Sequence, residues 1–253
     1  MSLQKFFIRI LNDIACALAP PRCLICGDIM GCNSSPICAD CYVRMPFTRM
    51  KGREGNGVER IFWAKIPIRR ANAFLYYTDS AICRDIAFAI KYHGRPEVAH
   101  AFGRIIATDL KGGDFFSGID GIVPIPLSPE REKERGYNQC RMLAEGIAEV
   151  TGLPIIDDAI IRTKDNPSQT HLTKSEREDN VRDIFCLLRP EAVAGKHLLL
   201  VDDVITTGAT LLSAGRTLAE GESVSLSILA LFVAGRHSEG ADIFDKQETN
   251  PHE

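Results

Sequence analysis

The chain has 253 residues, a formal net charge of -3 and 45% hydrophobic residues. This length allows one large α/β domain and a small second domain, so we expect two domains. The weak negative charge excludes a global attraction to nucleic acid or to anionic membranes, and any such contact would need a local basic patch. No apolar run in the sequence approaches the length of a membrane span.

The first twenty residues predict an amphipathic helix. Phe7, Ile10 and Ile14 recur at helical spacing. The segment imitates a signal peptide, but Arg9 and Asp13 interrupt the apolar stretch that such a peptide needs. We therefore expect a cytoplasmic protein whose cysteines serve as metal ligands or free thiols rather than in disulfides.

A cysteine cluster follows this helix. Cys23, Cys26, Cys38 and Cys41 form two C-x2-C pairs, a spacing typical of a zinc ribbon. Four thiolates leave no open position on the metal, so the expected Zn²⁺ is structural rather than catalytic. Cys32 lies between the pairs and is interpreted as a bystander, although an exchange of ligands stays open. The alternative for the cluster is a set of buried or redox-active thiols.

After a Gly-rich linker, the remaining sequence alternates between strands and helices. The expected strands are residues 73–77, 119–126, 154–156, 198–201 and 224–233, and the expected helices are 82–92, 98–110 and a segment that ends near 150. This alternation predicts an α/β fold with a parallel sheet and helices on both faces. Ligands of such sheets bind beyond the carboxyl ends of the strands.

The most informative segment is residues 198–210, where four apolar residues precede Asp202 and Asp203. Small hydroxylated residues around Gly208 follow, and an apolar helix then begins. Free N–H groups and the positive end of the helix dipole favour an anion at such a helix start, and a glycine lets the backbone approach it closely. We expect this anion to be a phosphate.

The two carboxylates must serve a different part of the ligand, because they repel a phosphate. Hydroxyl groups or a divalent cation are suitable partners for Asp202 and Asp203, and a ribose phosphate offers both. A P-loop is not supported, since Gly195 and Lys196 are followed by His197 and lack the earlier glycine. Walker B and phospho-receiver segments share the acidic pair but not the residues after it, and a purely structural βα turn is the remaining alternative.

This segment closely resembles the phosphoribosyl pyrophosphate (PRPP) motif of type I phosphoribosyltransferases. The resemblance implies that Asp202 and Asp203 hold the ribose 2- and 3-hydroxyls and are important for catalysis, and that Mg²⁺ accompanies PRPP. The other PRPP-binding residues implied are Val204, Thr206, Thr207, Gly208, Ala209 and Thr210.

Three further matches narrow the family, and together with the cysteines they resemble the ComF family of competence-protein-F-like phosphoribosyltransferases. These matches are Lys91-Tyr-His-Gly94, then Val123-Pro-Ile-Pro-Leu-Ser128 with Arg135-Gly-Tyr-Asn-Gln139, and then Gln169 with Leu172, Arg177 and Asn180-Val181. The resemblance runs from about Cys23 to Val233 and implies a type I phosphoribosyltransferase fold and a role in DNA uptake during natural transformation. One departure is Gly221-Glu222, where the family usually has Gly-Ala.

Two polar segments supply further candidate site residues. Arg131, Lys133 and Arg135 are candidates for binding pyrophosphate, with Arg135 the catalytic candidate because Gly136 follows it. Glutamates interleave with these residues, so a solvated charged helix is the alternative. The stretch from Thr163 to Arg182 predicts a lid loop that contains Gln169, Arg177 and Asn180, and its alternative is an ordinary surface loop.

The expected domains are an amphipathic helix at residues 1–20, a zinc ribbon at 21–50, a phosphoribosyltransferase-like domain at 57–236 and a disordered tail at 237–253. The phosphoribosyl acceptor stays unidentified, because the specificity residues lie in a hood and loops that the sequence does not resolve. No dedicated general base is evident either. A non-catalytic PRPP-sensing or single-stranded nucleic-acid-binding accessory protein is therefore the alternative function. Arg44, Arg49, Lys51 and Arg53 would then contact single-stranded DNA, with the DNA-uptake machinery as another candidate partner, although solvation alone explains these side chains.

Overall fold

The computed structural model describes residues 16, 18–31, 36–92, 94–163 and 184–234. They group into two compact units. One contains the described residues up to Met45 together with Asp79–Ala89, and the other contains Pro46–Thr78 and the residues from Ile90 onward. Most of the expected N-terminal helix, the whole of the expected tail, and the lid residues Gln169, Arg177 and Asn180 lie outside the described residues.

The first unit consists of the cysteine-bearing loops, the short helix α2 (Ala39–Val43) and most of helix α4 (Ala81–Lys91). A tight loop begins at Cys23, whose N–H donates to the carbonyl of Asp28 at 2.8 Å. An antiparallel bridge between Arg22 and Ile29 closes the base of this loop. The helix α4 confirms the helix expected at residues 82–92.

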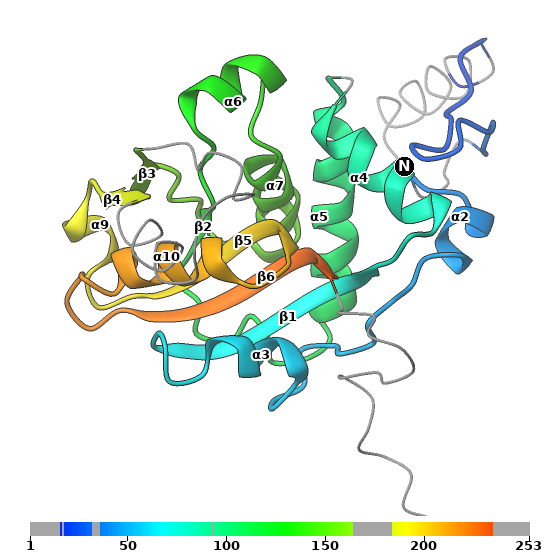
Figure 1. Ribbon diagram of the computed structural model, residues 1–253. Helices are drawn as coiled ribbons and strands as arrows, with labels where there is room; N and C mark the ends of the chain where they lie inside the picture. The colour runs from blue at the N-terminus through cyan, green and yellow to red at the C-terminus, as the bar shows by residue number, and fades with distance from the viewer. Residues whose placement is uncertain (1–15, 17, 32–35, 93, 164–183, 235–253) are drawn as a thin grey trace, which may run out of the picture. The chain divides into compact units, whose positions relative to one another are not determined.

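The second unit contains a four-stranded sheet in the order β1-β6-β5-β2, and every neighbouring pair in it is parallel. Figure 1 shows these strands side by side. Their bounds are β1 (Ile68–Tyr77), β2 (Gly121–Pro124), β5 (His197–Ile205) and β6 (Ser225–Ala234). Nearly every residue of β5 and β6 is buried, as expected for strands that are covered on both faces. The predicted parallel sheet is confirmed.

Two strand boundaries differ from the expectation in ways that affect the site. The strand β5 continues to Ile205 because it stays paired with β6 as far as Val233, so Asp202 and Asp203 lie within the strand rather than after it. The strand expected at residues 154–156 is reduced to a single bridge between Ile155 and Ile122. A short apolar run therefore did not suffice to define a strand there.

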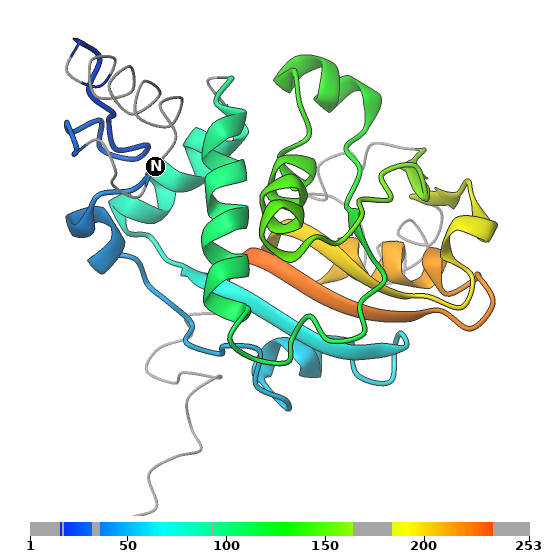
Figure 2. The same cartoon turned by 180° about the vertical axis from the view of Figure 1, so that it is seen from behind.

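Helices cover both faces of this sheet (Figures 1 and 2). The helices α5 (Pro96–Leu110) and α7 (Gln139–Thr151) lie on one face, and α3 (Gly57–Phe62) and α10 (Ala209–Leu218) lie on the other. Phe62 and Leu211 belong to the same buried cluster as Leu198 and Leu200 of β5, so alternate residues of one strand face this second helix layer.

A small antiparallel pair, β3 (Ile160–Arg162) with β4 (Phe185–Leu187), lies beside the main sheet and was not expected from the sequence. Two short helices, α6 (Pro129–Arg135) and α9 (Pro190–Val193), complete the second unit. Within the described residues, no helix has both the length and the apolar character needed to cross a membrane.

Candidate functional site

The turn between β5 and α10 forms the floor of a pocket. Gly208 is the residue that precedes the helix, and it has no side chain to cap the N–H groups of the first turn. A cavity of about 220 Å³ lies over this turn, and its lining consists of Ile184, Asp202, Val204, Ile205, Thr206, Thr207, Gly208, Ala209, Thr210 and Leu211. The N–H of Ala209 donates to Oγ1 of Thr207 at 3.4 Å. The turn therefore places N–H groups of a helix start beside threonine hydroxyls, as an anion site requires.

Gly208 has a conformation and a packing contact that require glycine. Its φ of +77° lies in the left-handed region. A Cβ at this position would lie 2.7 Å from Cγ2 of Ile61 in α3. The missing side chain therefore lets α10 pack closely on α3, and the expected close approach to a ligand stays a prediction.

Asp202 and Asp203 are both buried but have different partners. Oδ1 of Asp202 accepts a hydrogen bond from the N–H of Asp203 at 2.8 Å and from the thiol of Cys140 at 3.4 Å. Oδ2 of Asp203 lies 3.1 Å from Nζ of Lys91. This contact is an ion pair rather than a directed hydrogen bond, because Oδ2 of Asp203 accepts none within the described part of the chain.

Burial and charge repulsion change the ionisation of this group of side chains. Burial, and then the neighbouring charge of Asp203, raise the pKa of Asp202 to about 7. Burial and the two carboxylates raise the pKa of the Cys140 thiol well above its ordinary value. Cys140 therefore keeps its proton and donates a hydrogen bond to Asp202. A protonated thiol is not a ligand for a hard cation.

A second cavity of about 230 Å³ shares Asp202, Val204, Thr206 and Thr210 with the first, so the two are lobes of one pocket. Its remaining lining residues are Lys91, Ile125, Pro126, Leu127, Arg131, Arg135, Gln139, Cys140, Arg162 and Asp203. Four cationic side chains and two carboxylates therefore surround this lobe, which suits a ligand with several negative charges.

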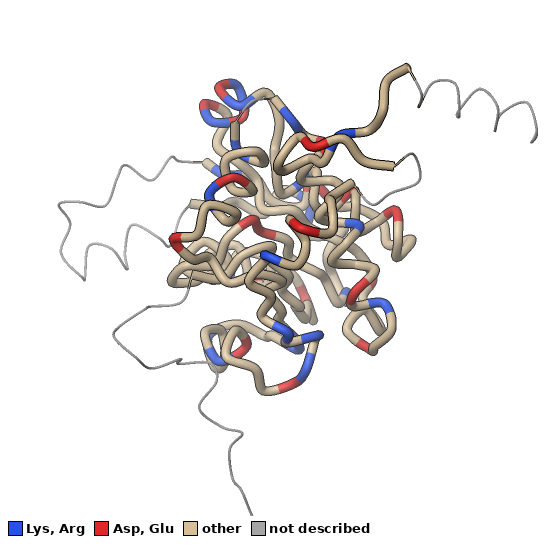
Figure 3. Tube along the Cα trace, turned by 90° about the vertical axis from the view of Figure 1, so that its right-hand side faces the viewer, with Lys and Arg blue, Asp and Glu red and all other residues tan. Residues whose placement is uncertain are grey.

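The helix α6 brings two of its three candidate cations to the pocket. Arg131 and Arg135 are one helical turn apart and line the second lobe, whereas Lys133 is exposed and does not line it. Arg135 is held by Gln139, which accepts its hydrogen bond, and by the ring of Tyr92, 5.9 Å from its guanidinium carbon. Figure 3 shows blue and red residues alternating along α6, as the charged-helix alternative requires.

The sequence assigns no role to several residues that line the pocket, among them Lys91, Cys140 and Arg162. Lys91 appears in it only as part of a family match, and Cys140 and Arg162 belong to none of the motifs. Lys91 carried a usable signal, because it belongs to the segment Lys91-Tyr-His-Gly94. Cys140 and Arg162 carried none, since only the tertiary structure brings α7 and β3 to the end of β5.

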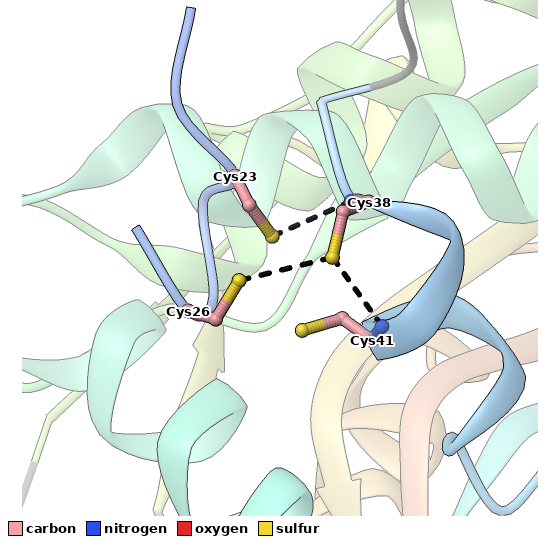
Figure 4. Close-up of side chains that lie close together, drawn as sticks. All are labelled: Cys23, Cys26, Cys38 and Cys41. Atoms are coloured by element: carbon pink, nitrogen blue, oxygen red, sulfur yellow. Dashed lines mark hydrogen bonds between the residues drawn. The ribbon is translucent and has the colours of Figure 1, made fainter. Parts of the chain in front are cut away.

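The four paired cysteines of the first unit point toward one another (Figure 4). Their sulfur atoms lie within 4.8 Å of one another, and Sγ of Cys26 is 3.7 Å from Sγ of Cys38. Ligand sulfurs around a tetrahedral zinc ion are about 3.8 Å apart. The cluster therefore fits a four-coordinate metal ion such as zinc.

The environment of these thiols also favours a bound cation. Burial opposes ionisation of Cys23, but backbone N–H groups, first that of Cys38, lower its pKa to about 6. Burial and the neighbouring thiols raise the pKa of Cys41. Four thiolates this close repel one another, and a divalent cation would relieve the repulsion.

Comparison with known proteins agrees with the architecture of the second unit. The family model described as a phosphoribosyl transferase domain matches residues 138–251, from the residue before α7 onward. This part of the chain contains β5 and β6 of the parallel sheet and the strand, turn and helix of the pocket, and it is similar to a phosphoribosyltransferase domain.

Curated relatives define the family further. The chain is 32% identical over 164 residues to competence protein ComFC of Bacillus subtilis, which covers 61% of each protein. It is 30% identical over 145 residues to DNA utilization protein YhgH of Salmonella typhi, covering 56% of this chain and 63% of that protein. Competence protein F of Haemophilus influenzae is 33% identical over 93 residues, 36% of this chain and 41% of its own length. The chain is therefore similar, over about three fifths of its length, to curated competence and DNA utilization proteins.

The chain spans about three fifths of the length of ComFC and YhgH. Among solved structures, an adenine phosphoribosyltransferase aligns with 54% of this chain and 71% of its own, at 19% identity and a TM-score of 0.35. The assignment of the domain rests on the family model and on the sheet.

Proposed function

We propose that the protein binds PRPP in the two-lobed pocket and transfers its phosphoribosyl group to an acceptor. One observation carries this proposal. The two buried carboxylates lie in the second half of β5, and the start of α10, which Gly208 leaves without a side-chain cap, follows shortly after this strand. One ligand that has both a phosphate and adjacent hydroxyls would therefore contact both.

In this proposal Asp202 and Asp203 hold the ribose hydroxyls. Oδ2 of Asp203 is buried and accepts no hydrogen bond from the described residues, so a ribose hydroxyl would supply the missing donor. The 5-phosphate occupies the turn of Thr206, Thr207, Gly208, Ala209 and Thr210, and Val204 lines the ribose side.

The pyrophosphate occupies the second lobe, where Arg131 and Arg135 provide positive charge and Lys133 would act from outside the lining. Mg²⁺ prefers oxygen ligands, and carboxylate oxygens at the boundary of the two lobes fit that preference. When bound with PRPP, Mg²⁺ would neutralise charge on the pyrophosphate as it leaves. The lid residues Gln169, Arg177 and Asn180 stay part of the proposal.

Chemistry at the anomeric carbon of PRPP needs no covalent nucleophile. As pyrophosphate leaves, the ribose carbon gains oxocarbenium character, and the buried carboxylates fix the orientation of the ring. Arg135, held by Gln139 and Tyr92, stabilises the charge of the leaving group. The relatives named for competence and DNA utilization support the further proposal that this chemistry serves DNA uptake in the cytoplasm.

Calorimetric titration with PRPP and Mg²⁺ tests the binding step. The wild-type protein should bind PRPP, and Asp202→Asn combined with Asp203→Asn should weaken binding at least about 100-fold, because two charged hydrogen-bond acceptors are lost. The matched control is Asp109→Asn, since Asp109 is exposed on α5. No PRPP binding by the wild-type protein would overturn the proposal.

Pyrophosphate release in the presence of nucleobase and amine acceptors tests the transfer step. Turnover that disappears in the double variant supports an enzyme. PRPP binding without turnover across the panel favours a PRPP-sensing accessory protein.

We also propose that the four-cysteine cluster binds one structural Zn²⁺ ion. The observed spacing of the sulfur atoms supports this metal. Metal analysis of the purified protein should find one zinc per chain, and Cys38→Ser should lose it. The control Cys186→Ser removes an exposed free thiol elsewhere and should keep the metal. A full zinc content in Cys38→Ser would contradict the proposal.

Single-stranded DNA binding is a second candidate function, and the surface around α3 favours it. Trp63, the only tryptophan of the chain, is 48% exposed at the end of α3. Arg49, Lys51 and Arg53 precede this helix and are exposed, whereas Arg44 pairs with Asp40 in the first unit. Single strands bind where bases stack on aromatic rings beside cations.

Fluorescence of Trp63 gives a direct measurement of this second function. Single-stranded DNA should quench it, salt should weaken the effect, and Lys51→Glu with Arg53→Glu should weaken it further. The control is a single charge reversal, Lys111→Glu, at an exposed lysine beside the far end of α7. Unchanged fluorescence and no binding at low salt would remove this candidate.

A further inference from the structure

The ion pair between Lys91 and Asp203 places a cation where a ligand of the pocket would bind. Lys91 is the last residue of α4, and its Nζ lies 3.1 Å from Oδ2 of Asp203. The carboxylate is the more enclosed partner, with 8% of its side chain exposed against 29% for the lysine. The buried charge is thus balanced by a side chain that still reaches solvent.

Lys91 is the neighbouring cation of only one of the two carboxylates. Oδ1 of Asp202 accepts hydrogen bonds from the N–H of Asp203 and from Cys140, and its raised pKa lowers its charge. Asp203 has no such hydrogen bond at Oδ2. A ribose hydroxyl that takes this oxygen must therefore replace or displace Lys91.

The backbone around Lys91 is held against the other wall of the pocket. The hydroxyl of Tyr137 donates to the carbonyl of Ile90 at 2.9 Å, and the ring of Tyr92 lies under the guanidinium of Arg135. The residues on both sides of Lys91 are thus fixed to the segment that carries Arg131 and Arg135. Its long side chain can change partner without movement of the backbone.

We propose that Lys91 is a ligand-binding residue that changes partner when PRPP binds. It neutralises Asp203 in the empty pocket, and it moves to the pyrophosphate oxygens when the ribose hydroxyls take Asp203. This inference rests on the proposed function. This change of partner makes the pocket selective for PRPP over ribose 5-phosphate. Ribose 5-phosphate breaks the same ion pair but has no pyrophosphate group with which Lys91 could pair instead.

Titrations of Lys91→Met with PRPP and with ribose 5-phosphate, both with Mg²⁺, test this role. The variant should bind PRPP roughly tenfold more weakly, since one charge-assisted contact is lost. It should bind ribose 5-phosphate as well as the wild-type protein or more tightly, because Asp203 is free. Lys91→Arg should recover most of the PRPP affinity, and Lys111→Met should leave both affinities unchanged.

Inorganic pyrophosphate with Mg²⁺ gives the reciprocal measurement. Asp203→Asn releases Lys91, so this variant should bind pyrophosphate at least as tightly as the wild-type protein while ribose 5-phosphate binding is lost. If Lys91→Met lost affinity for both sugar phosphates equally, the lysine would only support the fold. This outcome would overturn the proposed role of Lys91 and leave the proposed function of the protein intact. Wild-type protein that binds neither sugar phosphate would contradict the proposed function as well.

Discussion

Gly208 is subject to two independent constraints, and each can be measured. Its backbone lies in the left-handed region, which costs other residues about 1–2 kcal/mol. Its Cα also faces Ile61 so closely that no Cβ fits. The start of α10 is therefore fixed by the packing of two helices, and the direction of its first N–H groups follows from that packing.

We predict that Gly208→Ala destabilises the protein by about 3 kcal/mol or more, because it adds steric overlap to the backbone cost. Gly136→Ala is the matched control, since Gly136 has a φ of +81° but no atom near its absent Cβ. Gly136→Ala should lose only the stability that corresponds to the backbone cost. Urea unfolding of both variants gives the comparison, and equal losses would contradict the role of the contact with Ile61.

Asp202 makes stability depend on pH. Its pKa is raised in the folded protein, so between about pH 4 and pH 7 the folded state keeps a proton that the unfolded state has lost. Because the folded state binds more protons, this contribution to stability is present below pH 4 and is lost as the pH rises through 7.

The amide introduced by Asp202→Asn does not titrate, so this variant does not lose stability in this way as the pH rises. The difference in free energy of unfolding, variant minus wild type, should therefore be larger at pH 8 than at pH 5. We expect the difference to grow by more than about 1 kcal/mol. Urea unfolding at both pH values is the measurement, and Asp109→Asn is the exposed control. A difference that stays constant with pH would argue against a raised pKa.

At the scale of elements, the crossing of α5 and α7 positions one side of the pocket. Gly103 and Gly146 meet at this crossing, and a Cβ on either would lie 2.1 Å from a backbone oxygen of the opposite helix. The first turn of α7 carries Gln139 and Cys140, which contact Arg135 and Asp202. These two glycines lie away from the pocket, but they determine how closely α7 packs on α5. They therefore determine where the first turn of α7 lies beside the pocket.

We predict that Gly146→Ala costs at least about 3 kcal/mol of stability, because the added carbon meets backbone that cannot rotate away. Gly112→Ala is the control, since Gly112 has open space around its absent Cβ and an ordinary φ. Thermal unfolding followed by circular dichroism measures both variants. A Gly146→Ala protein as stable as the control would show that the helices separate easily.

At the scale of the whole molecule, the two compact units rely on different sources of stability. The large buried cluster of apolar residues lies entirely in the second unit. The segment around the cysteines has few buried apolar side chains, among them Ile37 and Met45. A metal ion would replace the core that so small a segment lacks.

We predict that a zinc-selective chelator, used in the presence of excess Mg²⁺, unfolds the cysteine-bearing unit and leaves PRPP binding by the second unit within about twofold of its untreated value. Calorimetric scanning should lose one transition, and PRPP titration of the same sample should still show binding. Re-addition of zinc provides the control for reversibility. Loss of PRPP binding on chelation would mean that the second unit does not stand alone.

The sequence by itself determined the parallel sheet, the layers of helices and the location of the acidic pair before a helix start. Hydrophobic periodicity and the turn at Gly208 are local properties, so they are visible in a linear chain. The C-x2-C pairs are equally local, and the observed cluster agrees with them. The bounds of the expected domains, by contrast, remain predictions, because the first unit takes in residues 79–89 from the middle of the chain.

Only the tertiary structure decided which side chains meet the acidic pair. Lys91, Cys140 and Arg162 come from three elements far apart in sequence, and neither periodicity nor spacing encodes their approach to β5. On α6, Arg131 and Arg135 are one helical turn apart and both line the pocket, whereas Lys133 is exposed and does not line it. The proposed ligand follows from local backbone and charge, whereas the balance of charge around the acidic pair depends on long-range packing, which a single sequence does not record.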